Sequence, residues 1–156
     1  MIRKIFLLII FLLISSCGYE TVYSKKNINI FNFSINEINF IGDRIINLKI
    51  KEKLNNYTLN KKEKNFTLKI NSSVNKVILG KDTSGDPTSF KIMVKVRVEF
   101  LRKDKVKDNI SIVESFNYNN NNNKLDLKKY EREVKNNLAG LITNKLIFKL
   151  TQIQWL

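Results

Sequence analysis

Histidine is absent from this 156-residue chain, and cysteine occurs once, at Cys17. The first absence removes the commonest general base and the commonest metal ligand. A single thiol has no partner for an intrachain disulfide. Ser115 and Thr88 have no activating base near them, and Gly80-Lys81 lacks the second glycine and the Lys-Ser/Thr ending of a phosphate-binding loop. We therefore expect no enzyme, no cofactor and no metal site.

Long apolar runs are also scarce. The N-terminal run 5–14 is about ten residues long, whereas a membrane-spanning helix needs roughly 20. It follows a basic start and ends in small residues at Cys17, which is the build of a secretory signal. With Ile14 three positions before the cysteine, the pattern is that of a bacterial lipobox, in which the thiol is acylated and the chain is cut before it. A buried strand or short anchor with an incidental cysteine is the alternative, but it leaves the basic start unexplained.

The lipobox divides the chain into three parts. We expect residues 1–16 to be a lipoprotein signal peptide, residues 17–26 a lipidated tether, and residues 27–156 a single domain. About 140 residues after cleavage are enough for one hydrophobic core. Two or more acyl chains hold a protein stably on a membrane, whereas one binds only marginally.

Acidic residues are few relative to basic ones. The chain has 28 Lys and Arg against 14 Asp and Glu, a formal net charge of +14. Basic surfaces attract phosphates of nucleic acid, phospholipid or anionic glycolipid, and export makes nucleic acid the least compatible of these. A composition rich in Lys, Asn and Ile is typical of genomes poor in G and C, so composition bias explains part of the charge.

Residues 28–59 predict a strand followed by a helix. From Ile28 to Phe40 apolar residues alternate with polar ones, with one irregularity, which indicates a β-strand that contains a bulge. Asp43 can then cap a helix. The apolar residues of this helix recur at helical spacing, at Ile46, Ile50, Leu54 and Tyr57.

Three more strands and a long helix are expected after residue 65. The second strand begins at Phe66 and can continue to Leu79, and a turn cluster at 80–87 contains the only proline. Phe90 to Phe100 is the clearest strand, because one face is entirely apolar. A charged hairpin loop at 102–109 leads to a fourth strand at 110–118.

The closing helix follows the asparagine run 119–123, which we expect to be a flexible loop. Asp126 is its predicted N-cap. Its apolar stripe is Leu127, Tyr130, Val134, Leu138, Leu141, Ile142, Leu146 and Leu150. The residues 146–148 are apolar on more than one side, which predicts deep burial or an interface. The fold class is therefore α+β, in the order β-α-β-β-β-α: a four-stranded mixed sheet with two helices packed on one face.

The second face of this sheet is left for solvent or a partner. Lys91, Lys95 and Arg97 alternate with the core residues of the third strand, so they share that face, and Lys81 lies in the adjoining turn. These cations could bind the phosphates of an anionic lipid. A solvated strand face kept soluble by lysines is the alternative.

Several stretches, in order, resemble the LPS-assembly lipoprotein family LptE in its alphaproteobacterial form. They are Cys17-Gly18-Tyr19 with Tyr23, the strand 90–98, and a last helix with Tyr130, Glu131, Asn137, Leu138 and Ile142. The resemblance implies a lipoprotein on the periplasmic face of the outer membrane that plugs and helps to assemble the β-barrel LptD. Together the two proteins pass lipopolysaccharide to the outer leaflet.

The resemblance also implies direct contact with lipopolysaccharide. Gly18 fits outer-membrane sorting, because an aspartate at that position favours retention in the inner membrane. Our predicted lipopolysaccharide contacts are Lys81, Lys91, Lys95 and Arg97. Two other functions remain open: an envelope lipid-transport auxiliary lipoprotein, or a structural lipoprotein of another barrel-assembly or secretion complex.

Overall fold

The computed structural model describes residues 33–59, 61–102 and 105–153. The predicted signal peptide (1–16), the tether (17–26) and Cys17 lie outside the described residues. The elements are β1 (Ser34–Gly42), α2 (Arg44–Leu54), the short 3-10 helix η2 (Asn55–Tyr57), β2 (Asn65–Lys81), β3 (Pro87–Arg102), β4 (Lys105–Asn119) and α3 (Lys124–Gln152). This order confirms the predicted α+β class.

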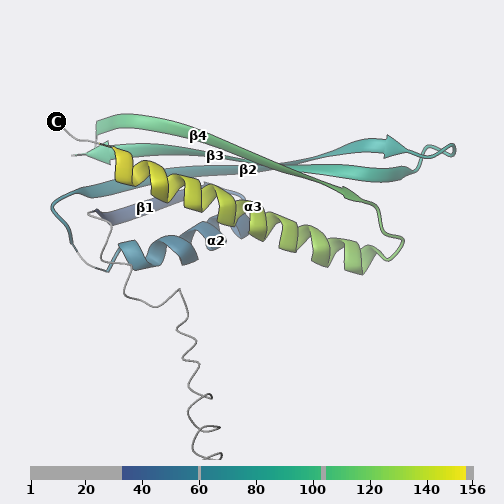
Figure 1. The fold of residues 1–156 in the computed structure, drawn as a ribbon, viewed down its shortest axis with the longest axis horizontal. Coiled ribbons are helices and arrows are strands. Elements are labelled where there is room, and N and C mark those ends of the chain that lie inside the picture. The colour runs from purple at the N-terminus through teal and green to yellow at the C-terminus, as the bar shows by residue number, and fades with distance from the viewer. Residues whose placement is uncertain (1–32, 60, 103–104, 154–156) are drawn as a thin grey trace, which may run out of the picture. The chain divides into compact units, whose positions relative to one another are not determined.

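The four strands form one mixed sheet in the order β1-β2-β3-β4. β1 pairs with β2 in parallel, and the other two pairings are antiparallel. The expected irregularity in β1 is present as a register shift between Ile35 and Glu37. Figure 1 shows α2 and α3 on the same side of the sheet, as predicted. We call the helix-covered face the inner face and the opposite one the outer face.

The core lies between the inner face and the helices. Alternate residues of β3 from Phe90 to Phe100 are buried, which confirms the predicted register of this strand. Opposite them, β2 buries Phe66, Leu68 and Ile70. Because side chains alternate between the faces of a strand, this burial places the intervening residues of β3 on the outer face.

α2 begins where the sequence predicts. The side chain of Asp43 accepts hydrogen bonds from the backbone N–H groups of Ile45 (2.9 Å) and Ile46 (3.0 Å), as an N-cap does. The preceding Gly42 has φ +101°, and a Cβ at this position would lie 1.8 Å from the carbonyl oxygen of Ser72. Glycine is therefore required at the junction of β1 and α2.

α3 begins three residues earlier than predicted. Asn123 is the N-cap, because its side chain accepts from the N–H groups of Leu125 and Asp126; the predicted cap, Asp126, lies in the first turn. The buried residues follow the predicted stripe at Val134, Leu138, Ile142, Leu146 and Leu150. Leu141, which we placed in the stripe, is exposed, and Ala139 and Thr143 are buried in addition.

The connections are shorter than the sequence suggests. β3 runs to Arg102 and β4 starts at Lys105, so most of the predicted loop 102–109 is strand. The charged residues in this segment favoured the prediction of a loop. They are compatible with strand because the ends of β3 and β4 lie in solvent. The asparagine run is a compact connection: the Asn120 amide donates to the Pro87 carbonyl oxygen (2.7 Å), and the Asn121 side chain accepts from the Asn123 N–H (2.9 Å).

The sheet has two unlike ends. At the end we call the proximal half, β1 and α2 are present and the C-terminal part of α3 lies over the strands (Figure 1). At the distal half, beside the β2–β3 turn, the sheet consists of β2, β3 and β4, and α3 covers it with its N-terminal part (Figure 1).

Candidate functional site

The outer face carries three of the four predicted lipopolysaccharide contacts. Lys91, Lys95 and Arg97 lie on β3, one of the two central strands. Lys95 and Arg97 are two residues apart, which separates their Cα atoms by about 7 Å along the strand. The structure therefore brings these cations into one line down the middle of the outer face.

Among the described residues, these cations have no partner that neutralises them. In residues 33–59, 61–102 and 105–153, no ion pair or side-chain hydrogen bond involves Lys91, Lys95 or Arg97. The ion pair on the same face joins Lys69 Nζ and Glu99 Oε2 at 3.8 Å. Glu99 is thus engaged with β2 rather than with the cations of its own strand.

Apolar side chains lie among the cations. Val77 is opposite Lys91 on β2, and Val113 is opposite Lys95 on β4. Their side chains are 38% and 48% exposed. Met93 lies between the two lysines on β3 and is half-buried. The outer face therefore offers isolated positive charges with apolar surface between them, which suits a ligand that has both phosphates and hydrocarbon.

Lys81 lies apart from this line. It is the last residue of β2 and pairs with Pro87 beside the turn. In the turn, the Asp82 carboxylate accepts from the N–H groups of Ser84 (2.9 Å) and Asp86 (2.8 Å). The Asp82 side chain therefore bonds the backbone of its own turn, as turn residues usually do.

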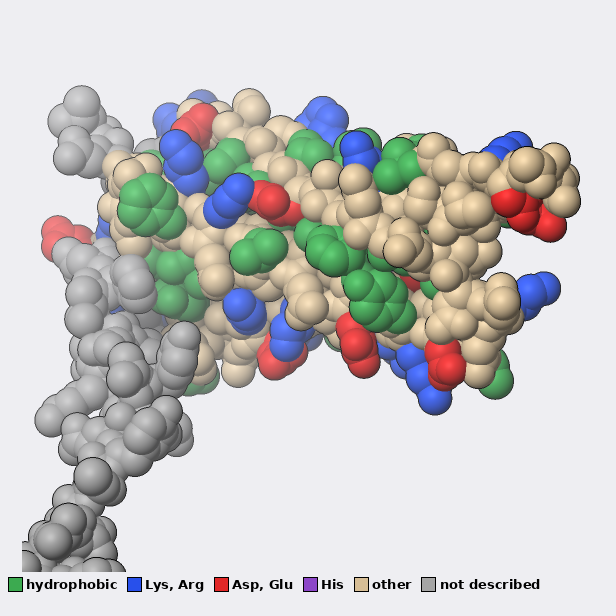
Figure 2. Space-filling model, turned by 45° about the vertical axis from the view of Figure 1, so that its right-hand side comes forward, with side chains coloured by type: hydrophobic (Ala, Val, Ile, Leu, Met, Phe, Trp, Pro, Cys, Tyr) green, Lys and Arg blue, Asp and Glu red, His purple; other side chains and the backbone are tan. Residues whose placement is uncertain are grey.

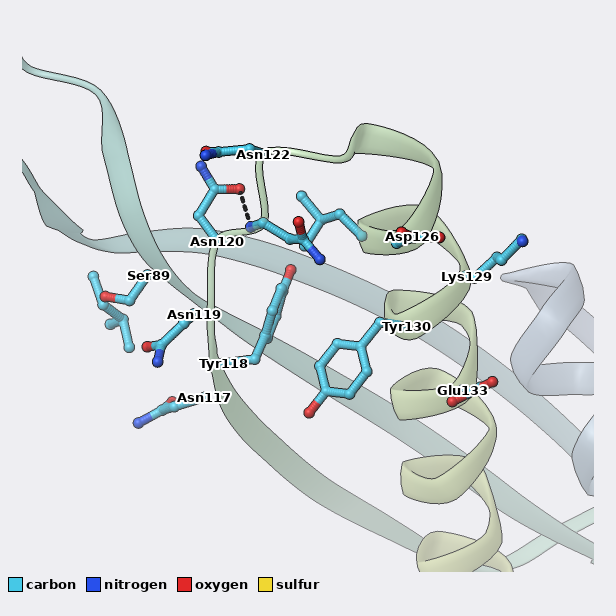
Figure 3. A pocket seen from close by; sticks show the side chains of 13 residues that line it. Ser89, Asn117, Tyr118, Asn119, Asn120, Asn122, Asp126, Lys129, Tyr130 and Glu133 are labelled. Carbon is cyan, nitrogen blue, oxygen red and sulfur yellow. Dashed lines mark hydrogen bonds between the residues drawn. The ribbon is translucent and has the colours of Figure 1, made fainter.

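An open hollow of about 1120 Å³ lies at the distal end, where β4 meets the start of α3. Tyr118 and Tyr130 lie between β4 and α3, whereas Ser89, Asn117 and Asn119 lie on the other side of β4 (Figure 3). These polar groups are divided by the strand and do not converge on one point. The hollow is therefore a surface depression rather than a built ligand pocket.

A polar cluster joins α3 to the inner face at this end. Glu131 accepts hydrogen bonds at Oε1 from Lys76 Nζ (2.5 Å) and from the Tyr118 hydroxyl (2.7 Å). The Lys76 ammonium also lies 3.8 Å from the centre of the Phe90 ring, within cation–π distance. The sequence pattern does not indicate this cluster, because Lys76 stands on the inner face at a position that alternation assigns to an apolar residue.

The cluster shifts two pKa values. Burial alone raises the pKa of Glu131, but hydrogen bonds from Lys76 and Tyr118 and the charges of Lys76 and Lys135 outweigh it, so the pKa lies below its usual value. Burial, followed by the hydrogen bond to Glu131 and its charge, raises the pKa of Tyr118. Glu131 is therefore held ionised and Tyr118 protonated.

The C-terminal part of α3 is only partly buried. Leu146 is buried, whereas Phe148 is 61% exposed and lines an apolar hollow of about 400 Å³ with Ile110 and Ile112 of β4. On the face that Figure 2 shows, hydrophobic side chains form several separate patches with charged side chains between them. The predicted deep burial of residues 146–148 thus holds for Leu146 and not for Phe148. An interface at Phe148 stays a prediction.

A basic groove runs between the two helices. Its lining, which we call the α2–α3 groove, is Arg44, Ile45, Leu48, Lys49, Glu52, Arg132 and Asn136, and its volume is about 470 Å³. The two helices run in the same direction, since Lys135 reaches Asp43 (4.0 Å) at the start of α2 and Lys53 reaches Asn144 (3.1 Å) near its end. None of the residues that line the groove is among the predicted lipid contacts.

Two properties of the described residues bear on the functional class. No helix among them is both long and apolar enough to cross a membrane. Nor do they contain a group of three or more His, Cys, Asp or Glu side chains that could hold a metal ion.

Comparison with known proteins identifies the fold. No protein-family model and no curated protein sequence matches the chain. Among the solved structures that are similar to it are three bacterial lipoproteins. The match to rare lipoprotein B from Shewanella oneidensis has 11% sequence identity and a TM-score of 0.53, and it covers 73% of this chain and 96% of that one. For a minor lipoprotein from Acinetobacter baumannii the identity is 14%, the TM-score 0.52 and the coverage 73% of this chain and 92% of that one; for lipoprotein B from Nitrosomonas europaea the values are 12%, 0.51, 75% and 83%. The domain has the fold of these bacterial lipoproteins.

Proposed function

We propose that this protein is an outer-membrane lipoprotein of the LptE type, anchored through Cys17 on the periplasmic face. In this role it plugs an LptD-type β-barrel, supports its assembly and takes part in passing lipopolysaccharide to the outer leaflet. The proposal combines the lipobox, the resemblance of the sequence to LptE, and a fold that recurs in bacterial lipoproteins.

The observation that carries the lipid-binding part is the outer face. Lys91, Lys95 and Arg97 lie there without partners in the part of the chain that the structure describes, with exposed valines beside them. Lipid A presents phosphates next to acyl chains. Arginine can bind a phosphate with two hydrogen bonds, and each lysine acts as a point charge.

The mechanism is physical rather than chemical. The sheet and its helices form a rigid body that fills the lumen of the barrel, with the polar outer face toward the polar barrel interior. The cations of β3 and Lys81 at the end of β2 then replace metal ions that bridge the phosphates of neighbouring lipopolysaccharide molecules. This loosens the lipid aggregate as the lipid enters the barrel.

Charge reversal tests the outer face. We expect K91E/K95E/R97E to lose most binding in a pull-down with labelled lipopolysaccharide, because three attractive charges become repulsive. Circular dichroism should show an intact fold, since the three side chains lie outside the core. The matched control is K61E/K124E/K128E, which makes the same change in net charge at exposed positions elsewhere. Equal binding by the two variants contradicts the proposed contacts.

Membrane extraction tests the anchor and the partner. Mass spectrometry of the mature protein should find an acylated Cys17 at the N-terminus, and C17A should leave the membrane fraction. A large β-barrel should co-purify in stoichiometric amount after extraction with mild detergent. Co-purification of an inner-membrane transporter, or of a different assembly complex, overturns the LptD partnership and favours one of the two other functions.

A further inference from the structure

The α2–α3 groove contains two of the chain's few arginines. Arginine occupies five of the 28 basic positions, and lysine the other 23. A genome poor in G and C enriches its proteins in lysine but not in arginine. This bias in amino-acid composition therefore does not account for Arg44 and Arg132. These residues lie 88 positions apart in sequence and line one groove from two different helices.

Neither arginine has a partner within the part of the chain that the structure describes. No ion pair or side-chain hydrogen bond involves Arg44 or Arg132. The nearby acidic groups are engaged elsewhere: Glu52 pairs with Lys49 at 2.8 Å, and Asp43 caps α2 and lies 4.0 Å from Lys135. The groove thus retains two uncompensated guanidinium groups.

Folding gains little from this arrangement. Two like charges that line one groove repel each other. Arg44 is also the first residue of α2, where the helix dipole disfavours a cation. An anion between the arginines reverses the sign of both effects, because it attracts the two guanidinium groups and the start of the helix together.

The rest of the lining defines the anion further. The Asn136 side chain has no hydrogen-bond partner among the described residues and can donate a further hydrogen bond. Leu48, 55% exposed, and half-buried Ile45 supply an apolar wall. We propose that the α2–α3 groove binds a phosphate group, held by Arg44, Arg132 and Asn136, with room for an apolar substituent against Leu48. This site is on the helix side of the domain and is separate from the outer face.

Nuclear magnetic resonance of the full chain in neutral detergent tests the site, with inorganic phosphate titrated against sodium chloride at equal ionic strength. We expect saturable shifts of the Leu48 and Asn136 amide signals and of the Nε–Hε signals of Arg44 and Arg132. R44Q/R132Q should weaken binding by about tenfold or more, because two charge-assisted contacts are lost. R44K/R132K should fall in between, since lysine keeps the charge but not the bidentate fork.

K61Q/K107Q is the matched control, because it removes the same charge from exposed positions outside both the groove and the line of outer-face cations. It should change phosphate binding by no more than about twofold, since only screened long-range attraction is lost. Equal weakening in K61Q/K107Q and R44Q/R132Q, or the same signal shifts with sodium chloride alone, overturns the site.

A second arm identifies the source of the phosphate. Micelles doped with phosphatidylglycerol should shift the groove signals in the unmodified chain and not in R44Q/R132Q. Zwitterionic phosphatidylcholine should act more weakly, because its choline group offsets the charge of its phosphate. A response to inorganic phosphate without one to phosphatidylglycerol assigns the groove to a free phosphate ligand. Lipopolysaccharide binding through the outer face is independent of this result, because R44Q/R132Q leaves Lys91, Lys95 and Arg97 in place.

Discussion

The proximal half of the sheet lies under α2 and the C-terminal part of α3, and Ile46, Ile50 and Leu146 are fully buried there. The distal half lacks β1 and α2. At that end Ile78 of β2 is 49% exposed, and Phe116 of β4 is 44% exposed. There the polar cluster of Lys76, Glu131 and Tyr118 joins α3 to the sheet, together with the ring contact between Tyr118 and Tyr130.

The comparison shows two ways to attach a helix to one sheet. Apolar burial is strong and non-directional, and it stabilises the proximal half over a wide area. A hydrogen-bonded ion pair is weaker in net terms but fixes the position of the helix, because its geometry is specific. The distal half should therefore be the less stable of the two.

The largest expected effect comes from the proximal core. Leu146→Ala should reduce the free energy of unfolding by about 3 kcal/mol, because it leaves a cavity beneath α3. Urea denaturation followed by circular dichroism measures this change, with an unaltered dependence on urea concentration as the sign of a simple loss of stability. A loss below about 1 kcal/mol contradicts the division between the two halves.

An intermediate effect is expected at the cluster. Glu131→Gln should reduce the free energy of unfolding by about 1–2 kcal/mol at neutral pH, because the hydrogen bond to charged Lys76 is weakened and Lys76 is partly exposed. Glu133→Gln, an exposed neighbour with no described partner, is the control and should have almost no effect. Equal effects at the two positions show that the cluster does not stabilise the distal half.

The effect at Glu131 should also depend on pH. Its pKa is lowered in the folded state, so ionised Glu131 stabilises the fold fully above the ordinary glutamate value of 4.5. This contribution is lost as the pH falls through the folded-state pKa. Denaturation curves of the unmodified protein and of Glu131→Gln should therefore converge as the pH is lowered below 4.5. A constant gap between them excludes the ionised carboxylate as the cause.

The smallest effect is expected at the distal end of β2. Ile78→Ala removes a side chain that is already half in water, so the free energy of unfolding should fall by about 0.5 kcal/mol. The same urea experiment applies. A loss as large as that of Leu146→Ala means that something covers this end of the sheet in solution.

Sequence patterns were sufficient for the fold because both faces of the central strand are unambiguous. The alternation from Phe90 to Phe100 determines which side chains meet the helices, and the period of α3 determines its buried stripe. The N-cap of α3 was wrong because Asp and Asn are both good caps, and five asparagines stand before Asp126.

Prediction of the binding surfaces was less complete. Alternation placed Lys91, Lys95 and Arg97 on one face, but nothing local indicates that Arg44 and Arg132 line the same groove. Lys76 also lies on the inner face, where alternation favours an apolar residue; it is accommodated because Glu131 of α3 reaches it. Such pairings depend on how elements that are distant in sequence pack together. The spacing of residues within one element does not encode this packing.

The parallel pairing of β1 with β2 has a consequence for the order in which the domain folds. Ser34 pairs with Asn65, so this edge of the sheet closes only after the intervening helix has been made and docked. The strands β2, β3 and β4 are joined by short turns, so they can pair through contacts between residues close in sequence, which form quickly. β1 therefore has to wait, unpaired, for β2, a neighbouring strand that is synthesised after it.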